Sequence, residues 1–416
     1  MQVFKFGGAS VKDADGIKNL ASALKTIGYK NTLVVVSAMG KTTNALEVVV
    51  KNYIDRNNEL QSSLQEVKKY HNAILLDLFE NENHSIFTKL ISLFNELNNI
   101  LKTNKSPDYN FVYDQVVGYG ELISTLIVSE YLGSIGIKNN WIDVREHIKT
   151  DNYYRRANVN WEATQKRISS SFKKSVLNIT QGFLGSDANN FTTTLGREGS
   201  DYTAAIYAYC LNATNVTIWK DVPGVLNADP RYFENAILLN KISYREAIEL
   251  AFYGASVIHP KTLQPLQQKE IPLFVKSFLN PKSKGTRIGK EVILNPLVPC
   301  FIVKKKQVLI RLSSLDFSYI VEDNISEIFN LLHRYKMKVD VIQNSAISFS
   351  VCIDDNYDHL ETLLHHLKAK FKVVCYKDVS LYTIRHYTKK AIDQIEADKT
   401  VLLKQLTQET VQIVTK

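Results

Sequence analysis

Residues 1–10 read MQVFKFGGAS, and the stretch KFGGAS at 5–10 places a lysine and two adjacent glycines directly after a short apolar run. Residues 3–6 predict a strand. Glycines that follow a strand let the backbone turn sharply or approach a ligand closely. Their consecutive N–H groups can form an anion-binding nest, and Lys5 adds a positive charge beside it. The stretch predicts a phosphate site, with a simple tight turn as the open alternative.

The residues after this turn continue a strand–helix–strand pattern. Apolar residues at 17, 20, 21 and 24 have helical spacing, and TLVVVSAMG at 32–40 is typical of a strand buried on both faces. Strands and helices alternate again from about 111 to 280, whereas residues 45–110 show helical periodicity alone. We therefore predict an α/β fold, a three-layer α/β/α sandwich with a mostly parallel central sheet and a helical excursion at 45–110.

A change of composition near residue 286 predicts a second domain. The stretch at 280–299 is rich in Pro, Gly and Lys, which is typical of a linker. Residues 307–380 then follow the order β-α-β-β-α-β of a ferredoxin-like unit. Residues 298–306 and 381–416, with a helix expected at 389–406, predict a reduced second unit. The predicted domains are 1–285 and 298–416, joined by a linker at 286–297.

Composition limits the classes of protein that the chain can belong to. Its 416 residues are 45% hydrophobic and 22% charged, which predicts a globular protein of two or three domains. No apolar run reaches the roughly 18 to 20 residues of a membrane span. The four cysteines lack metal or redox spacing, so we expect them reduced in a cytoplasmic protein. The net charge of +9 is spread along the chain, which favours small anionic substrates over nucleic acid.

A second glycine-rich stretch, TLGREGSDYTAAIYAYCL at 194–211, begins a predicted helix. The free N–H groups of a helix start favour anions, and Arg197 adds a guanidinium that can bind a carboxylate or phosphate through two hydrogen bonds. The alternative is that Ser200 or Asp201 merely caps the helix. Both interpretations are compatible with each other.

A third stretch, TIWKDVPGVLNADPRYF at 217–233, combines a strand with a Pro-Gly turn. A loop after a strand end could hold a nucleotide base near Lys220 and Asp221, with Arg231 near phosphates. An ordinary turn is the alternative.

Together with VVVSAMGKTTN at 34–44 and GYGELISTL at 118–126, these stretches resemble the aspartate kinases of the amino-acid-kinase superfamily over essentially the whole chain. The family motif K-F-G-G-[TS]-S-V is KFGGASV here, the acceptor loop ending in [IT]-T-N is KTTN, and G-R-G-G-S-D is GREGSD. The resemblance implies ATP-dependent phosphorylation of the β-carboxylate of L-aspartate, the first step toward lysine, threonine and methionine. Two alternatives remain, a degenerate kinase fold that senses amino acids and a kinase for another carboxylate.

The resemblance also assigns roles by position. It implies catalytic roles for Lys5, Gly7, Gly8 and Asp201, with Asp201 orienting Lys5 or the substrate amine. It implies substrate binding by Ser37, Thr43, Glu121, Arg197 and Ser200, and nucleotide binding by Lys220, Asp221, Leu226, Arg231 and Lys261. Further substrate-loop positions are Asp143, Arg145 and either Arg155 or Arg156. Mg²⁺ is expected to arrive with ATP, so no dedicated metal site is predicted.

Two positions depart from the family pattern. Glu198 replaces a glycine, and because its charge is unfavourable near phosphate we expect its side chain to face solvent. Ser256 stands where a nucleotide-contacting lysine is expected, and Lys261 could replace that lysine. His259, just before a proline, is interpreted as structural.

The C-terminal region resembles an ACT domain, a module that binds amino-acid effectors between paired copies. The resemblance implies lysine or threonine as effector and a homodimer or higher homo-oligomer. Asp340 and Ser345 match effector-loop positions, whereas the family's glycine-containing first loop is VEDNIS at 321–326. A purely structural role in dimerisation is the alternative.

Overall fold

The structure is a computed structural model that describes residues 1–416 except 82, 173–174, 256–257 and 317. The chain forms two compact units. The first comprises Met1–Val225, Leu238–Ile248 and Val257–Leu294, and the second comprises Leu226–Ile237, Glu249–Ser256 and Asn295–Lys416. The last change of unit thus falls within the predicted linker at 286–297. Two short stretches that the sequence assigns to the first domain group with the second unit instead.

An eight-stranded sheet forms the centre of the first unit. Its order is β3 (Asn139–Ile142), β4 (Leu177–Gln181), β2 (Thr32–Val36), β1 (Gln2–Phe6), β7 (Asn215–Lys220), β9 (Leu273–Ser277), β10 (Thr286–Gly289) and β8 (Lys241–Ser243). Neighbouring strands run parallel except β9 and β10, which confirms the mostly parallel sheet. All five residues of β2 are buried, as expected for an apolar strand covered on both faces.

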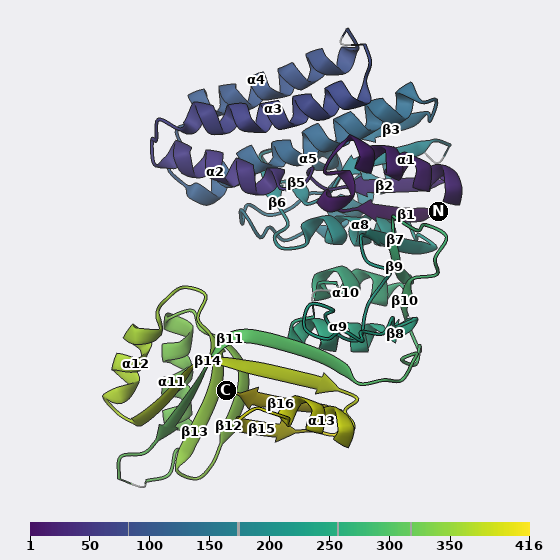
Figure 1. Ribbon diagram of the computed structural model, residues 1–416. Helices are drawn as coiled ribbons and strands as arrows, with labels where there is room; N and C mark the ends of the chain where they lie inside the picture. Colours follow the sequence, from purple (N-terminus) through teal and green to yellow (C-terminus); the bar gives the residue numbers. More distant parts are fainter. Residues whose placement is uncertain (82, 173–174, 256–257, 317) are drawn as a thin grey trace. The chain divides into compact units, whose positions relative to one another are not determined.

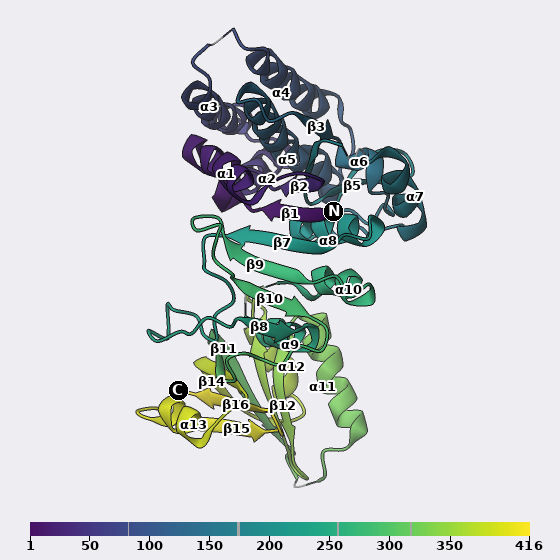
Figure 2. The ribbon, with the colours of Figure 1, turned by 90° about the vertical axis from the view of Figure 1, so that its right-hand side faces the viewer.

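Helices cover both faces of this sheet (Figures 1 and 2). The long helix α5 (Tyr109–Ser134) contacts β2, β3 and β4, and α8 (Gly199–Cys210) contacts β1 and β7 from the other side. The predicted three-layer sandwich is therefore confirmed. Within the described residues, no helix has both the length and the apolar character that a membrane span requires.

The helical excursion is built from α2 (Thr42–Ile54), α3 (Leu60–Leu78) and α4 (Ser85–Thr103), which lead into α5. The fully buried His71 ties α3 to the start of α2, because its Nε2 lies 3.3 Å from Thr42 Oγ1 and its Nδ1 lies 2.8 Å from the Val67 carbonyl oxygen. Burial lowers the pKa of His71 to about 4, so this imidazole is neutral near pH 7. The excursion thereby supports the loop that precedes α2.

Shorter elements complete the first unit. They are a 3-10 helix η1 (Gly8–Val11), the helices α1 (Ala14–Ile27), α6 (Val144–His147), α7 (Trp161–Ser171), α9 (Tyr244–Tyr253, whose second half belongs to the second unit) and α10 (Pro260–Gln268), and a two-stranded sheet of β5 (Leu184–Ser186) and β6 (Thr192–Thr194).

The second unit is a six-stranded antiparallel sheet with helices α11 (Glu322–Arg334), α12 (Leu360–Lys368) and α13 (Lys389–Glu396). Its order is β12 (Lys338–Asn344), β13 (Ser348–Asp354), β11 (Cys300–Ser313), β14 (Lys372–Arg385), β16 (Thr410–Thr415) and β15 (Val401–Leu406). The two central strands, β11 and β14, are each 14 residues long and run through both halves of the sheet. Their pairing shifts register near Gln307, beside the left-handed backbone of Lys306 and Asp378.

The predicted helix at 389–406 is wrong in its second half. Helix α13 ends at Glu396, the chain turns through Asp398 with φ of 60°, and residues 401–406 form β15 against β16. The sequence VLLKQL is rich in good helix formers, but pairing with β16 overrides that weak local preference.

Candidate active site

A cavity of about 490 Å³ opens in the first unit where three parallel strands end. Lys5 lies near the end of β1, Ser37 follows β2 and Lys220 is the last residue of β7. Loops at the carboxyl ends of parallel strands are where α/β sheets bind ligands. The three glycine-rich or polar stretches of the sequence therefore contribute to one cavity.

Lys5 and Asp201 form an ion pair at this cavity. Lys5 Nζ lies 2.7 Å from Asp201 Oδ1, and the two side chains are only 11% and 5% exposed. Lys5 comes from β1 and Asp201 from the first turn of α8. A partly dehydrated pair of this kind fixes the position of the ammonium while leaving it beside the cavity.

Close packing requires a glycine at position 8 of the first stretch. A Cβ on Gly8 would lie 2.7 Å from the Ala38 carbonyl oxygen and 3.0 Å from that of Gly40, so any side chain would force the two loops apart. The Gly40 N–H also donates to the Gly8 carbonyl at 3.0 Å. Gly7 lies beside Lys5, since a Cβ there would be 3.4 Å from Lys5 Nζ.

The start of α8 supplies another part of the cavity wall. Arg197, Gly199 and Ser200 line the cavity. Ser200 packs closely on Gly182, since a Cβ added to Gly182 would lie 2.4 Å from the Ser200 side chain. The N-terminus of this 12-residue helix favours anions. Arg197 is exposed and has no ion-pair partner among the residues that the structure describes. Its guanidinium is therefore available to a carboxylate or phosphate.

Glu121 is the buried acid of the cavity. The residue is 3% exposed, and burial raises the pKa of its carboxyl to about 8, against the effect of backbone hydrogen bonds. Within the described part of the chain, Glu121 Oε2 has no hydrogen-bond partner. A buried carboxyl oxygen without a partner stores an unfavourable free energy that a bound cation would relieve.

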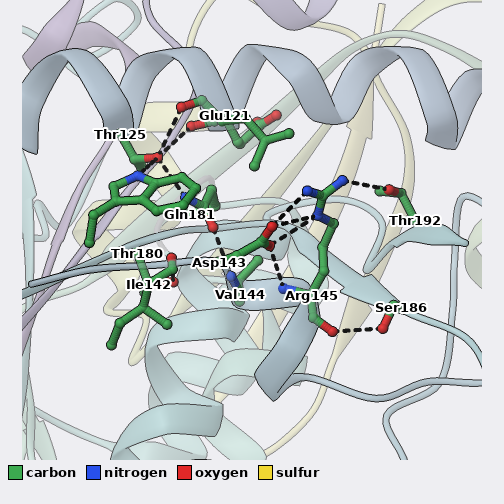
Figure 3. A network of polar contacts seen from close by, with 12 residues as sticks. Glu121, Thr125, Ile142, Asp143, Val144, Arg145, Thr180, Gln181, Ser186 and Thr192 are labelled. Atoms are coloured by element: carbon green, nitrogen blue, oxygen red, sulfur yellow. Dashed lines mark hydrogen bonds and ion pairs between the residues drawn. The ribbon is translucent and has the colours of Figure 1, made fainter. Parts of the chain in front are cut away.

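A hydrogen-bond network holds helix α5 near Glu121 (Figure 3). Thr125 Oγ1 donates to the Glu121 carbonyl oxygen at 2.9 Å and accepts from Gln181 Nε2 at 2.7 Å and Trp141 Nε1 at 3.0 Å. Gln181 Oε1 in turn accepts from the Val144 N–H at 2.8 Å. The backbone that carries Glu121 is thus tied to the end of β4 and to the loop after β3.

The same network includes two residues of the expected substrate loop. Arg145 donates to both carboxylate oxygens of Asp143, with Nη2 to Oδ2 at 2.6 Å, and its Nη1 donates to Thr192 Oγ1 at 3.3 Å (Figure 3). Neither Asp143 nor Arg145 lines the cavity. Their contacts hold the loop against β6.

Of the two candidate arginines, Arg155 lines the cavity and Arg156 does not. The Arg155 guanidinium lies 4.2 Å from the centre of the Tyr113 ring and 3.2 Å from Glu47. Its backbone has φ of 66°, in the left-handed region, and its N–H donates to the buried carboxylate of Asp114 at 3.0 Å. This bond and the ring contact hold Arg155 in a conformation that costs a non-glycine residue free energy.

The expectation that Glu198 faces solvent is wrong. Its side chain is half-buried, contributes to the cavity wall and accepts a hydrogen bond from the His259 N–H at 2.8 Å. The reason is the start of α10, whose unpaired N–H groups and dipole attract a carboxylate. His259 Nδ1 accepts from the Lys261 N–H at 3.2 Å, so the histidine caps α10, as the structural interpretation predicts.

The cavity brings together most of the predicted catalytic and substrate residues. Its lining includes Lys5, Gly8, Ser37, Thr43, Glu121, Arg197, Ser200, Asp201 and Lys220. The sequence did not single out other lining residues, namely Ala38, Gly40, Tyr113 and Phe183. Phe183 follows Gly182 with φ of 70°, a conformation that its residue type does not signal.

Five of the residues predicted for catalysis or nucleotide binding do not line the cavity, namely Gly7, Asp221, Leu226, Arg231 and Lys261. Leu226 and Arg231 belong to the second unit, where Arg231 Nη2 lies 2.6 Å from Asp229 Oδ2. Lys261 Nζ lies 5.8 Å from the centre of the Tyr202 ring. Ser256, the other position singled out for the nucleotide, lies outside the described residues.

The two predicted effector residues lie in the second unit. Asp340 on β12 is 7% exposed in its side chain, and its Oδ1 lies 2.7 Å from Lys304 Nζ and 3.9 Å from Lys338 Nζ. Ser345 follows β12, is exposed and donates its N–H to the Ser348 carbonyl oxygen at 2.7 Å. Asp340 therefore already has a cation as its partner.

The chain is similar to known proteins in both sequence and fold. The model of the "Amino acid kinase family" matches residues 1–277. Lysine-sensitive aspartokinase 3 of Escherichia coli is 34% identical over 351 residues, which is 82% of this chain and 75% of that protein. The chain spans about a third of the length of the bifunctional aspartokinase/homoserine dehydrogenases that it matches, for example 32% of one from Arabidopsis thaliana.

Two solved structures of E. coli aspartokinase III cover the whole of this chain. The complex with lysine and aspartate has a TM-score of 0.83 at 30% identity, over 95% of its own chain. The complex with aspartate and ADP has a TM-score of 0.81 at 28% identity, over 96% of its own chain.

Proposed function

The chain belongs to the amino acid kinase family, and within it to the aspartokinases; from this premise we propose that it transfers the γ-phosphoryl group of ATP to the β-carboxylate of L-aspartate. One observation carries the proposal. Lys5, Arg197 and Glu121, which come from three distant parts of the sequence, line a single cavity. The Lys5 ammonium can bind phosphate, the Arg197 guanidinium can bind a carboxylate, and the buried acid Glu121 can bind an ammonium group. This set of groups suits the phosphates of a nucleotide beside an acidic amino acid.

The charges of the cavity suit the charges of aspartate. In our proposal the Arg197 guanidinium binds the α-carboxylate through two hydrogen bonds. The α-ammonium pairs with Glu121, whose unpartnered Oε2 would gain a donor. Hydroxyls of Ser37, Thr43 and Ser200 add donors and acceptors around the substrate. Binding thereby favours the ionised form of Glu121.

The chemistry needs no general base. The β-carboxylate of aspartate is ionised near neutral pH, so one of its oxygens can form the bond to the γ-phosphorus directly. The bond between that phosphorus and the oxygen bridging to the β-phosphate breaks, and its electron pair remains on ADP. Lys5, oriented by Asp201, neutralises charge on the transferring group, and N–H groups of Gly7, Gly8 and the α8 start donate to its oxygens. Catalysis then consists of positioning and charge stabilisation.

The phosphates have cationic surroundings that fit them, in Lys5, Lys220 and the start of α8. Mg²⁺, when bound with the nucleotide, supplies further charge neutralisation. The described residues contain no group of three or more His, Cys, Asp or Glu that could hold a metal ion. We propose that phosphate oxygens and water provide most of its ligands. Lys220, Asp221, Leu226, Arg231 and Lys261 remain the proposed nucleotide contacts.

We further propose a homodimer or higher homo-oligomer in the cytoplasm that pairs through the second unit, with lysine or threonine as effector near Asp340 and Ser345. Support for an amino-acid effector comes from the E. coli neighbour that was solved with lysine. The Lys304–Asp340 ion pair implies that an effector ammonium must compete with an internal one.

An acyl-phosphate assay tests the proposed reaction. Purified protein with ATP, Mg²⁺, aspartate and hydroxylamine should form aspartyl hydroxamate, and glutamate or N-acetylglutamate should give much less. Stronger turnover of either alternative acid would redirect the proposal to another carboxylate. No hydroxamate at any Mg²⁺ concentration would favour a degenerate kinase fold that senses amino acids.

A further inference from the structure

The second unit contains a separate cavity of about 220 Å³. Its walls come from three parts of the chain. They include Tyr232 and Phe233 of the stretch Leu226–Ile237, Lys305 and Tyr382 of the central strands, and Gln394 and Lys399 in and after α13. All of these residues belong to the second unit, and none has a place in the proposed reaction.

The stretch that carries Tyr232 and Phe233 is fixed to the sheet. The Phe301 N–H donates to the Asn227 carbonyl oxygen at 2.7 Å, and Asn227 Nδ2 donates to the Pro299 carbonyl oxygen at 2.8 Å. The rings of Phe233 and Phe301 pack with their centres 5.1 Å apart. The aromatic wall is therefore a built part of the second unit.

Two ammonium groups converge on one tyrosine of this cavity. Lys305 Nζ lies 5.3 Å and Lys399 Nζ 5.6 Å from the centre of the Tyr382 ring, and Lys305 Nζ is 3.1 Å from the Tyr382 hydroxyl. Lys305 Nζ is also 5.9 Å from the centre of the Tyr232 ring. Tyr382 is 7% exposed, so its ring is a fixed platform rather than a surface group. The rings attract the two cations but do not neutralise them.

Neither lysine has an acidic partner among the residues that the structure describes, and no Asp or Glu lines the cavity. The nearby carboxylate of Glu396 is already 2.6 Å from Lys404 Nζ. Two like charges held at one ring repel each other, and an anion bound between them would reverse that unfavourable interaction. Among the described residues, the cavity lining therefore supplies no negative charge to balance the two lysines.

We propose that this cavity binds a small dianion, a phosphomonoester or a dicarboxylate. Lys305 and Lys399 would bind its two negative charges, and the Tyr382 hydroxyl and the Gln394 amide can donate hydrogen bonds. Phe233 and Tyr232 form an aromatic wall for a short carbon skeleton. The site repels a cationic amino acid such as lysine, which distinguishes it from the effector position near Asp340. The cavity is too small to bury a whole nucleotide.

Lysine reactivity in the full chain tests this site directly. The protein is treated with formaldehyde and a borohydride reductant, and methylation of each lysine is quantified by mass spectrometry, without ligand and with inorganic phosphate, O-phosphoserine or succinate. Lys389, an exposed lysine of α13 outside the cavity, serves as internal reference. We expect at least one dianion to protect Lys305 and Lys399 saturably while Lys389 is unaffected. The phosphate and succinate arms decide which kind of dianion the site prefers.

A pair of charge-matched variants completes the test. Lys305→Ala/Lys399→Ala should weaken binding of the protecting dianion at least about tenfold by equilibrium dialysis, since two charge-assisted contacts are lost. Lys389→Ala/Lys390→Ala removes the same charge and should leave binding unchanged. Equal weakening in both variants, equal protection of Lys389, or no protection by any of the three anions would overturn the proposal. Because protection is measured on the unmodified chain, a folding defect in a variant cannot obscure the result.

Discussion

The ammonium of Lys5 lies 2.7 Å from the carboxylate of Asp201, although one residue belongs to the first strand and the other to the first turn of α8. The pair joins the two glycine-rich stretches at one point of the cavity. A lysine on a flexible four-carbon chain would otherwise sample many positions. The contact converts it into a fixed charge.

Replacing Lys5 with alanine should lower turnover at least about a hundredfold, because it removes charge stabilisation that is strongest in the transition state. Steady-state kinetics measure the effect, and circular dichroism checks the fold. Lys18→Ala, which removes an exposed lysine of α1, is the matched control and should be silent. Near-normal turnover of the Lys5 variant would contradict its proposed role.

Aspartate binding should release close to one proton from Glu121 at pH 7. Its pKa of about 8 means that the free protein holds this carboxyl mostly protonated, and pairing with the substrate ammonium ionises it. Calorimetry in buffers of different ionisation enthalpy measures the released proton. Release should vanish in Glu121→Gln and at pH well above 8, and persist in Glu66→Gln, which alters an exposed carboxylate of α3. Release that survives Glu121→Gln would assign the proton to another group.

Arg197→Lys should raise the KM for aspartate at least about tenfold, because an ammonium cannot replace the two-point contact of a guanidinium with a carboxylate. The KM for ATP in the same variant is the internal control and should change little. If both KM values rise equally, Arg197 does not act on aspartate selectively.

Glu198→Gln should lower the KM for ATP roughly two- to fivefold. The change removes a negative charge from the cavity wall, and the amide oxygen can still accept from the His259 N–H. The gain should shrink at high salt, where charges on a half-buried wall are screened. A higher KM would show that the carboxylate has a favourable role in nucleotide binding.

His71 should make the fold sensitive to acid. Its pKa is about 4 in the folded chain and near 6.5 when unfolded, so between these values the unfolded chain binds more protons. Its contribution to stability is therefore present above pH 6.5 and lost as the pH falls toward 4, by an amount on the order of 3 kcal/mol. Urea unfolding should show a smaller loss between pH 6.5 and 4.5 in His71→Gln. His365→Gln, an exposed histidine of α12, should behave like the unmodified chain.

Much of the first unit follows from local sequence. The apolar run of β2 and the helical spacing of α1 are sufficient to predict a buried parallel strand and its helix, because both patterns repeat over several residues. The two glycine-rich stretches indicate the cavity, and Gly8 shows the reason, since a Cβ there would lie 2.7 Å from the Ala38 carbonyl oxygen.

What could not be predicted depends on contacts between distant residues. The direction of Glu198 is set by the start of α10, about sixty residues away in the chain. The strand β15 exists because β16 pairs with it, although its composition favours a helix. The left-handed backbone at Arg155 decides that Arg155, and not Arg156, lines the cavity.

The 14-residue strands β11 and β14 have a mechanical consequence for the C-terminal region. Each strand contributes backbone to both halves of the six-stranded sheet, so the two halves are covalently joined through both strands even where their pairing shifts register near Gln307. A displacement of the half that carries α13 is therefore transmitted through the backbone of β11 and β14 to the half that carries α11 and α12. This region should melt in one cooperative step, and a protease should find no cut that releases either half intact.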